Sequence, residues 1–169
     1  KGFKVLQTKK AYKELKKIVK EHHIKKIGVC KEKLLHYQYL KMNRLGKLLD
    51  VEDKLKELRS RKTQAELVKI RKACNITSNI FNKLIWKLKK FKTEKEILQF
   101  LKIETIKAGC ELAFEPVVAS GKRAATPHSA RHSRISKGFL VIDFGVKYKG
   151  YCSDMTRTFY KGKPTEKEK

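Results

Sequence analysis

Two apolar-rich runs in residues 139–159 flank a turn-prone centre, Tyr148-Lys149-Gly150. This pattern predicts a β-hairpin. If the first two centre residues form the turn, Asp143 lies directly opposite Asp154, and both side chains point to one face. If the last two form it, the aspartates become diagonal neighbours on that same face. Both registers therefore place two carboxylates on one face of the hairpin.

Two ionised carboxylates that face each other across a strand pair repel by a few tenths to about 1 kcal/mol, and burial makes each charge costlier. A divalent cation neutralises both charges, so Asp143 and Asp154 are candidate metal ligands. The residues leave a second interpretation open. The hairpin can be exposed, with both acids solvated or one of them paired with Arg157 or a lysine.

Apolar positions recur at threes and fours in the segment before the hairpin, which predicts two helices. Residues 63–66 form a capping box, and one long amphipathic helix follows them. Its expected inward positions are Leu67, Ile70, Cys74, Thr77, Phe81, Leu84, Leu88 and Phe91. Residues 93–96 form a second capping box, and Gly109 is expected to end the helix that follows it. Its expected inward positions are Ile97, Leu98, Leu101 and Thr105, and Trp86 is expected in the core or at its edge.

The amino-terminal part of the chain has a shorter and more basic pattern. Residues 9–21 predict an amphipathic helix, residues 26–30 a strand, and residues 34–40 a second helical run. A boundary is expected within residues 45–60. After Gly109 the period changes to that of extended structure, so the chain as a whole is expected to be of mixed α/β (α+β) class.

The formal net charge of +26 over 169 residues is extreme. The lysines are spread over every segment rather than gathered into a patch with interleaved aromatics, so solvated helix faces explain them better than a nucleic-acid site. No stretch is apolar enough to span a membrane. The four cysteines lack C-x-x-C spacing and are expected to be reduced and mostly buried, as in a cytoplasmic protein.

Several of these segments together resemble the pita-bread metallopeptidases, the family of methionine aminopeptidase, aminopeptidase P, prolidase and creatinase. The matching segments are VVASG (117–121), Pro127-His128, ISKG (135–138), VIDFG (141–145) and GYCSDMTRTF (150–159). The resemblance implies that residues 57–169 are the first half of a pita-bread (creatinase/aminopeptidase) catalytic domain. It also implies that residues 1–56 are a β/α remnant of the amino-terminal domain.

The same resemblance implies a centre of two divalent metal ions, Mn²⁺ or Co²⁺ first, with Zn²⁺ and Fe²⁺ as alternatives. In such relatives the aspartate matching Asp143 chelates one ion and the aspartate matching Asp154 bridges both. The residue matching His128 helps to hold the substrate or to transfer a proton. Thr156 shares a face with Asp154 and is a candidate hydrogen-bond donor to a metal-binding carboxylate, although a threonine also simply suits a strand.

The implied reaction is cleavage of peptides with proline in the second position, by an Xaa-Pro aminopeptidase or an Xaa-Pro dipeptidase. The family's other three ligands, a histidine and two glutamates, have no counterpart here, and Glu166 and Glu168 lie in a lysine-rich tail. We therefore expect the chain to be incomplete alone and to need a complementary carboxy-terminal half or a homo-oligomer. The alternatives are an inactive truncated remnant and a non-catalytic relative that binds nucleic acid or ribosomes.

Overall fold

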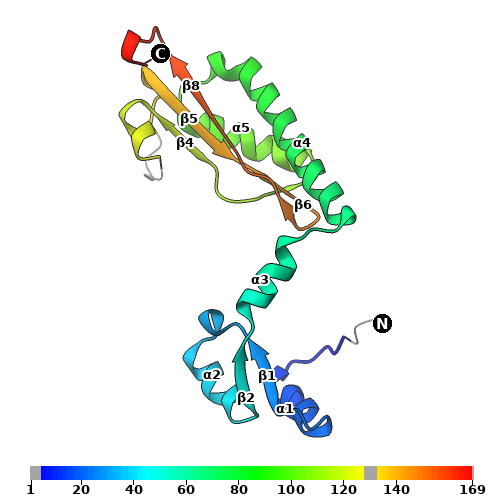
Figure 1. Cartoon of the computed structure of the whole chain (residues 1–169). Coiled ribbons are helices and arrows are strands. Elements are labelled where there is room, and N and C mark those ends of the chain that lie inside the picture. Colours follow the sequence, from blue (N-terminus) through cyan, green and yellow to red (C-terminus); the bar gives the residue numbers. More distant parts are fainter. Residues whose placement is uncertain (1–4, 128–132, 169) are drawn as a thin grey trace. The chain divides into compact units, whose positions relative to one another are not determined.

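The computed structural model describes residues 5–127 and 133–168 (Figure 1). It separates into two compact units, Lys1–Lys62 and Thr63–Lys169, which are described one at a time. No helix in the described part of the chain is both long and apolar enough to cross a membrane.

The first unit is a small parallel β/α arrangement. Its elements are α1 (Ala11–Glu21), β1 (Lys26–Val29), the 3₁₀ turn η1 (Lys31–Lys33), α2 (His36–Asn43), β2 (Lys47–Asp50) and α3 (Glu52–Ser60). β1 and β2 pair in parallel from Lys26↔Lys47 to Val29↔Asp50, and Val19, Val29 and Leu48 are buried. β2 and α3 occupy the segment that the sequence pattern indicated only as a boundary.

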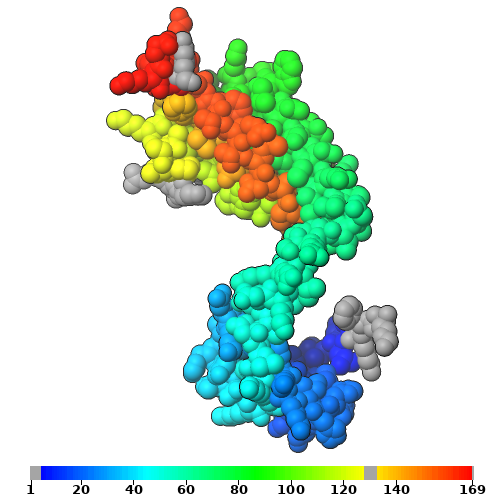
Figure 2. All heavy atoms as spheres, in the orientation of Figure 1, coloured from blue at the N-terminus to red at the C-terminus, as the bar shows by residue number. Residues whose placement is uncertain are grey.

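The second unit packs two helices on antiparallel strands. Its elements are α4 (Gln64–Lys87), η2 (Leu88–Lys90), α5 (Glu94–Lys107), β3 (Glu111–Leu112), β4 (Val117–Ser120), η3 (Gly121–Ala125), β5 (Gly138–Phe144), β6 (Val146–Tyr148), β7 (Tyr151–Cys152), β8 (Met155–Lys161) and η4 (Glu166–Glu168). One sheet has the order β4-β5-β8 and the other β3-β6-β7. α4 and α5 lie along one side of the first sheet (Figure 1), whereas β8 lies at the molecular surface (Figure 2, orange).

Both predicted capping boxes are present. The Thr63 hydroxyl accepts from the Glu66 amide at 3.3 Å, and Thr93 does the same for Glu96 at 3.2 Å. All four expected inward residues of α5 are buried. Gly109, at φ 66°, ends this helix, because the Cys110 amide reaches back to the Thr105 carbonyl at 3.1 Å.

The expectations for Cys74, Trp86 and the other cysteines are wrong. The buried stripe of α4 passes through Ala73, which is 0% exposed, and Cys74 faces outward. Trp86 is 87% exposed because it lies two residues, or about 200° of helical rotation, beyond the fully buried Leu84. The cysteines are free thiols as expected, but each is exposed or half-buried.

A buried carboxylate at the start of α5 forms hydrogen bonds with the end of β4 and with the segment that follows it. Glu94, 0% exposed, accepts hydrogen bonds from the amide and hydroxyl of Ser120 at 2.8 Å each and from the Ser133 amide at 3.0 Å. The Arg123 guanidinium also donates to it. Burial alone would raise the pKa of Glu94, but these donors outweigh it and hold the pKa below the ordinary value.

We predict that Glu94→Gln lowers the free energy of unfolding of the second unit by about 1–3 kcal/mol, because buried donors then lose their anionic acceptor. Since folding lowers the pKa of Glu94, its carboxylate stabilises the fold above the ordinary glutamate pKa, and this stabilisation is lost as the pH falls through the lowered pKa. The variant should therefore lose part of the acid sensitivity. Urea denaturation followed by circular dichroism at several pH values measures both effects.

The matched control is Glu115→Gln. Glu115 also forms an ion pair, with Lys102 at 2.6 Å, but its side chain is 71% exposed. Its replacement should change stability by less than about 1 kcal/mol. An equal loss in the two variants would contradict the role given to Glu94.

Candidate metal centre

The tip of the central hairpin determines which residues face each other. Lys149 and Gly150 have φ values of 47° and 84°, and Tyr148 pairs with Tyr151 across them. Two consecutive positive φ values are the property of a type I′ turn, whose twist suits a two-residue hairpin. The turn therefore lies at Lys149-Gly150, and the register with Asp143 directly opposite Asp154 is wrong.

In the observed register Asp143 faces Thr156, and Asp154 is the diagonal neighbour of Asp143. The Thr156 hydroxyl donates to Asp143 Oδ1 at 2.9 Å. Asp143 is half-buried and Asp154 exposed, whereas Ile142 and Phe144 on either side of Asp143 are fully buried. The two carboxylates thus lie on the open face of the sheet, opposite to the side that packs on the core.

The two carboxylates interact electrostatically. Partial desolvation and the neighbouring charge of Asp143 both raise the pKa of Asp154 above its ordinary value. Neither carboxylate is neutralised by a salt bridge with a described lysine or arginine. The pairing of one acid with Arg157, an alternative that the sequence left open, is not formed, since Arg157 donates to the Thr156 carbonyl.

The hairpin ladder is interrupted beside Asp154. A Cβ atom on Gly145 would lie 1.9 Å from the Ser153 carbonyl oxygen, so only glycine allows this approach. Ser153, which is 5% exposed, also hydrogen-bonds to Thr77 of α4 with 2.6 Å between their hydroxyl oxygens. The sequence pattern did not indicate a role for Ser153. One signal was available for Thr77, a polar residue among apolar inward positions.

His128 lies outside the described residues. On either side of it, η3 follows β4, and Ser133 is held by Glu94. The described residues therefore bring together Asp143, Asp154 and Thr156.

The donors at this site are oxygen atoms, which suit hard divalent cations such as Mn²⁺ or Mg²⁺. The carboxylates of Asp143 and Asp154 repel each other, and a bound cation would remove this electrostatic cost. No group of three or more His, Cys, Asp or Glu side chains with metal-binding geometry occurs among residues 5–127 and 133–168. The described chain thus contributes two carboxylates, fewer than a closed coordination sphere requires.

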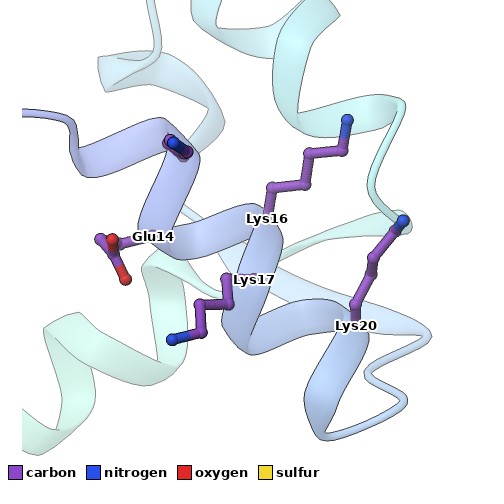
Figure 3. A pocket seen from close by; sticks show the side chains of 5 residues that line it. Glu14, Lys16, Lys17 and Lys20 are labelled. Carbon is purple, nitrogen blue, oxygen red and sulfur yellow. The ribbon is translucent and has the colours of Figure 1, made fainter.

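The basic charge forms no convergent site on α1. A shallow cavity of about 300 Å³ is lined there by Lys13, Glu14, Lys16, Lys17 and Lys20. Figure 3 shows Glu14 and Lys17 extending to one side of the helix and Lys16 and Lys20 to the other. Side chains that diverge in this way are typical of a solvated helix face.

Sequence comparison identifies the class of protein. The profile described as metallopeptidase family M24 matches residues 68–169, more than half of the chain. The chain therefore belongs to family M24, the pita-bread metallopeptidases, and the predicted resemblance is confirmed. Its fold is the mixed α/β arrangement of about half of a prolidase or aminopeptidase P structure.

Individual relatives were compared with the chain one by one. The Xaa-Pro dipeptidase of Pyrococcus horikoshii is 35% identical over 153 residues, which cover 86% of this chain and 43% of the relative. The solved Xaa-Pro dipeptidase from Bacillus anthracis superposes with a TM-score of 0.87 at 31% identity, covering 98% of this chain and 48% of that one. The solved X-Pro aminopeptidase from Thermotoga maritima superposes with a TM-score of 0.81 at 32% identity. The superposition covers 96% of this chain and 48% of the aminopeptidase chain.

The chain spans only part of each relative. It covers 32% to 43% of the curated relatives' length and 37% to 49% of the length of the solved chains. Membership of the family is thus established for this chain, whereas the activity of the complete relatives is a property of longer proteins.

We predict that Lys149→Asn stabilises the hairpin by about 0.5 kcal/mol, because Asn tolerates the positive φ of this turn position better than Lys. Gly150→Ala should cost about 1 kcal/mol, although a Cβ atom there meets nothing within 4 Å. Urea denaturation measures both changes.

Gly109→Ala is the control for Gly150→Ala. Gly109 also has a positive φ and open space around it, but it lies at the end of α5. Both alanine variants should lose similar stability, and only Gly150→Ala should move the amide resonances of Asp143 and Asp154. A stability loss on Lys149→Asn would contradict the type I′ assignment.

Proposed function

We propose that this chain provides the Asp143 and Asp154 ligands of a two-metal centre in a peptidase that acts on Xaa-Pro bonds. The observation that supports the proposal is the pair of carboxylates that lie as diagonal neighbours on the open face of the hairpin. Partial desolvation and the charge of Asp143 raise the pKa of Asp154 there. Membership of family M24 supports the metallopeptidase class. The names of the relatives, Xaa-Pro dipeptidase and X-Pro aminopeptidase, support the proline-directed branch.

In this proposal Asp143 and Asp154 would hold two divalent ions, Asp143 as a ligand of one ion and Asp154 as a ligand shared by both, with Mn²⁺ or Co²⁺ as the favoured metals. Bound divalent cations supply a water of lowered pKa and polarise the scissile carbonyl. The Thr156 hydroxyl fixes the orientation of the Asp143 carboxylate by donating to Oδ1. His128 is proposed to contact the substrate or to carry a proton, a role to which the pKa of histidine is suited.

The remaining ligands are proposed to come from outside residues 1–169. Two carboxylates hold a divalent ion weakly, because affinity rises with the number and geometry of the ligands. A complementary carboxy-terminal half, either continuous with this chain or separate from it, would provide them. Cleavage of an Ala-Pro-containing peptide should therefore require both halves together with the metal. An active mixture in which Asp154→Asn changes nothing would refute the proposed site.

The metal ligands can be tested on this chain alone. In a Mn²⁺ titration, paramagnetic broadening of backbone amide signals should be strongest around Asp143 and Asp154. Asp143→Asn and Asp154→Asn should each weaken this local broadening about tenfold or more, since a charged oxygen ligand becomes a neutral amide. Mn²⁺ binding should weaken as the pH falls. The pKa of Asp154 is raised, so this residue takes up a proton that competes with the metal.

Asp53→Asn provides the control for net charge, because the Asp53 side chain is fully exposed in the first unit. It removes one negative charge and should leave the broadening near the hairpin unchanged. Equal effects of the three substitutions would indicate non-specific attraction of the cation.

Thr156→Val should reduce Mn²⁺ affinity by up to about tenfold, because Asp143 loses the hydroxyl that orients it. Thr158→Val is a matched control. Thr158 lies two residues further along β8 on the same face, opposite Val141 rather than Asp143. The same titration compares them, and a loss common to both variants would identify a general effect on the strand.

A further inference from the structure

We infer that Thr77 and Ser153 form a buried hydroxyl pair that positions Asp154 for metal binding. The inference rests on the proposed function and adds two positioning residues to it. Neither residue lies on the open face with the carboxylates. Thr77 is 0% exposed in the middle of α4, and Ser153 is 5% exposed immediately before Asp154.

The first step is that the Ser153 hydroxyl replaces a main-chain acceptor. The register of the hairpin makes Val146 and Ser153 partners that should exchange two main-chain hydrogen bonds. One is present, from the Ser153 amide to the Val146 carbonyl at 2.9 Å. For the other, the Val146 amide donates to Ser153 Oγ at 3.0 Å, where a regular ladder would use the Ser153 carbonyl.

The second step is the orientation of the Ser153 carbonyl group. The Ser153 oxygen lies 1.9 Å from the place where a Cβ atom of Gly145 would stand. The peptide group between Ser153 and Asp154 is therefore turned towards Gly145 instead of continuing the ladder. β7 ends at Cys152 and β8 begins at Met155, on either side of this group. The orientation of this peptide group sets the direction in which the Asp154 side chain leaves the backbone.

The third step is the contact that holds the hydroxyl in place. Ser153 Oγ accepts from the Val146 amide and lies 3.2 Å from the Val146 carbonyl, to which it donates. It then has one acceptor position left, and Thr77 Oγ1 is 2.6 Å away. With Thr77 as the donor, the one-donor, two-acceptor capacity of the serine hydroxyl is completely used. α4 thus fixes the rotamer of Ser153 and, through it, the peptide group of Asp154.

The test compares hydroxyl removal at Thr77 with the same change at Thr105. Both threonines are buried in helices of the second unit, but Thr105 donates to the Leu101 carbonyl of its own helix at 2.8 Å. Thr77→Val should lower Mn²⁺ affinity at the hairpin about tenfold, as loss of an outer-shell contact does in other metal sites. Thr105→Val should leave the affinity unchanged, and Thr77→Ser, which keeps the hydroxyl, should restore most of it.

A second variant and a measurement without metal distinguish a loss of metal binding from a loss of folding. Ser153→Ala should also lower the affinity and should accelerate hydrogen exchange of the Val146 amide, which loses its acceptor. Circular dichroism verifies that each variant is folded. Combining Thr77→Val with Ser153→Ala should add little to either change alone, since both break one network.

The outcomes separate this inference from the proposed function. If Asp154→Asn weakens Mn²⁺ binding but Thr77→Val does so no more than Thr105→Val, the positioning role is overturned and the metal site stands. If Asp154→Asn leaves Mn²⁺ binding unchanged, the metal site itself is overturned, and the inference falls with it. An effect of Ser153→Ala without one of Thr77→Val would refute the contribution of α4.

Discussion

The conformation of two residues at the hairpin tip determines what the open face of the sheet presents. Lys149 and Gly150 both have positive φ, and the turn that they form fixes a single register along the hairpin. A slip by one residue would exchange the two faces of the strand. Asp143 would then point into the core in place of Ile142 and Phe144, which are both fully buried. The large cost of burying an unpaired carboxylate among apolar side chains opposes that slip, so the turn and the core favour the same register.

The candidate site is built on the reverse side of the most deeply buried part of the sheet. Phe144 and Val146 are 0% exposed, and Phe144 packs against Phe81 of α4 with ring centroids 5.4 Å apart. This packing holds the backbone that carries Asp143, while the aspartate side chain remains on the open face. The rigidity of the core thus compensates for the repulsion between the two carboxylates. A hairpin without this support would be free to separate the charges.

Local signals in the sequence predicted the helices and the acidic pair, but not the contacts that organise them. The capping boxes at Thr63 and Thr93 and the stop at Gly109 each involve neighbours within a few residues, so the pattern alone is sufficient. The turn position was ambiguous because a lysine at positive φ is uncommon. β2 was missed because its partner β1 is distant in sequence, and the donors to Glu94 lie 26 to 39 residues away from it. Trp86 was misplaced because its aromatic character was given more weight than its position, which lies about 200° of helical rotation from the buried Leu84.

Two carboxylates of the second unit respond to their surroundings in opposite ways, and the contrast separates a structural acid from the acid proposed as a metal ligand. Glu94 is buried but surrounded by donors, so its pKa is lowered and its charge is already satisfied. Partial desolvation and the neighbouring carboxylate of Asp143 raise the pKa of Asp154, and no described lysine or arginine forms a salt bridge with it. Folding supplies a cationic partner to the first acid, Arg123, and leaves the second beside a like charge. A cation from solution would relieve this repulsion. This is the physical reason to propose metal binding at the hairpin rather than at the better-connected Glu94.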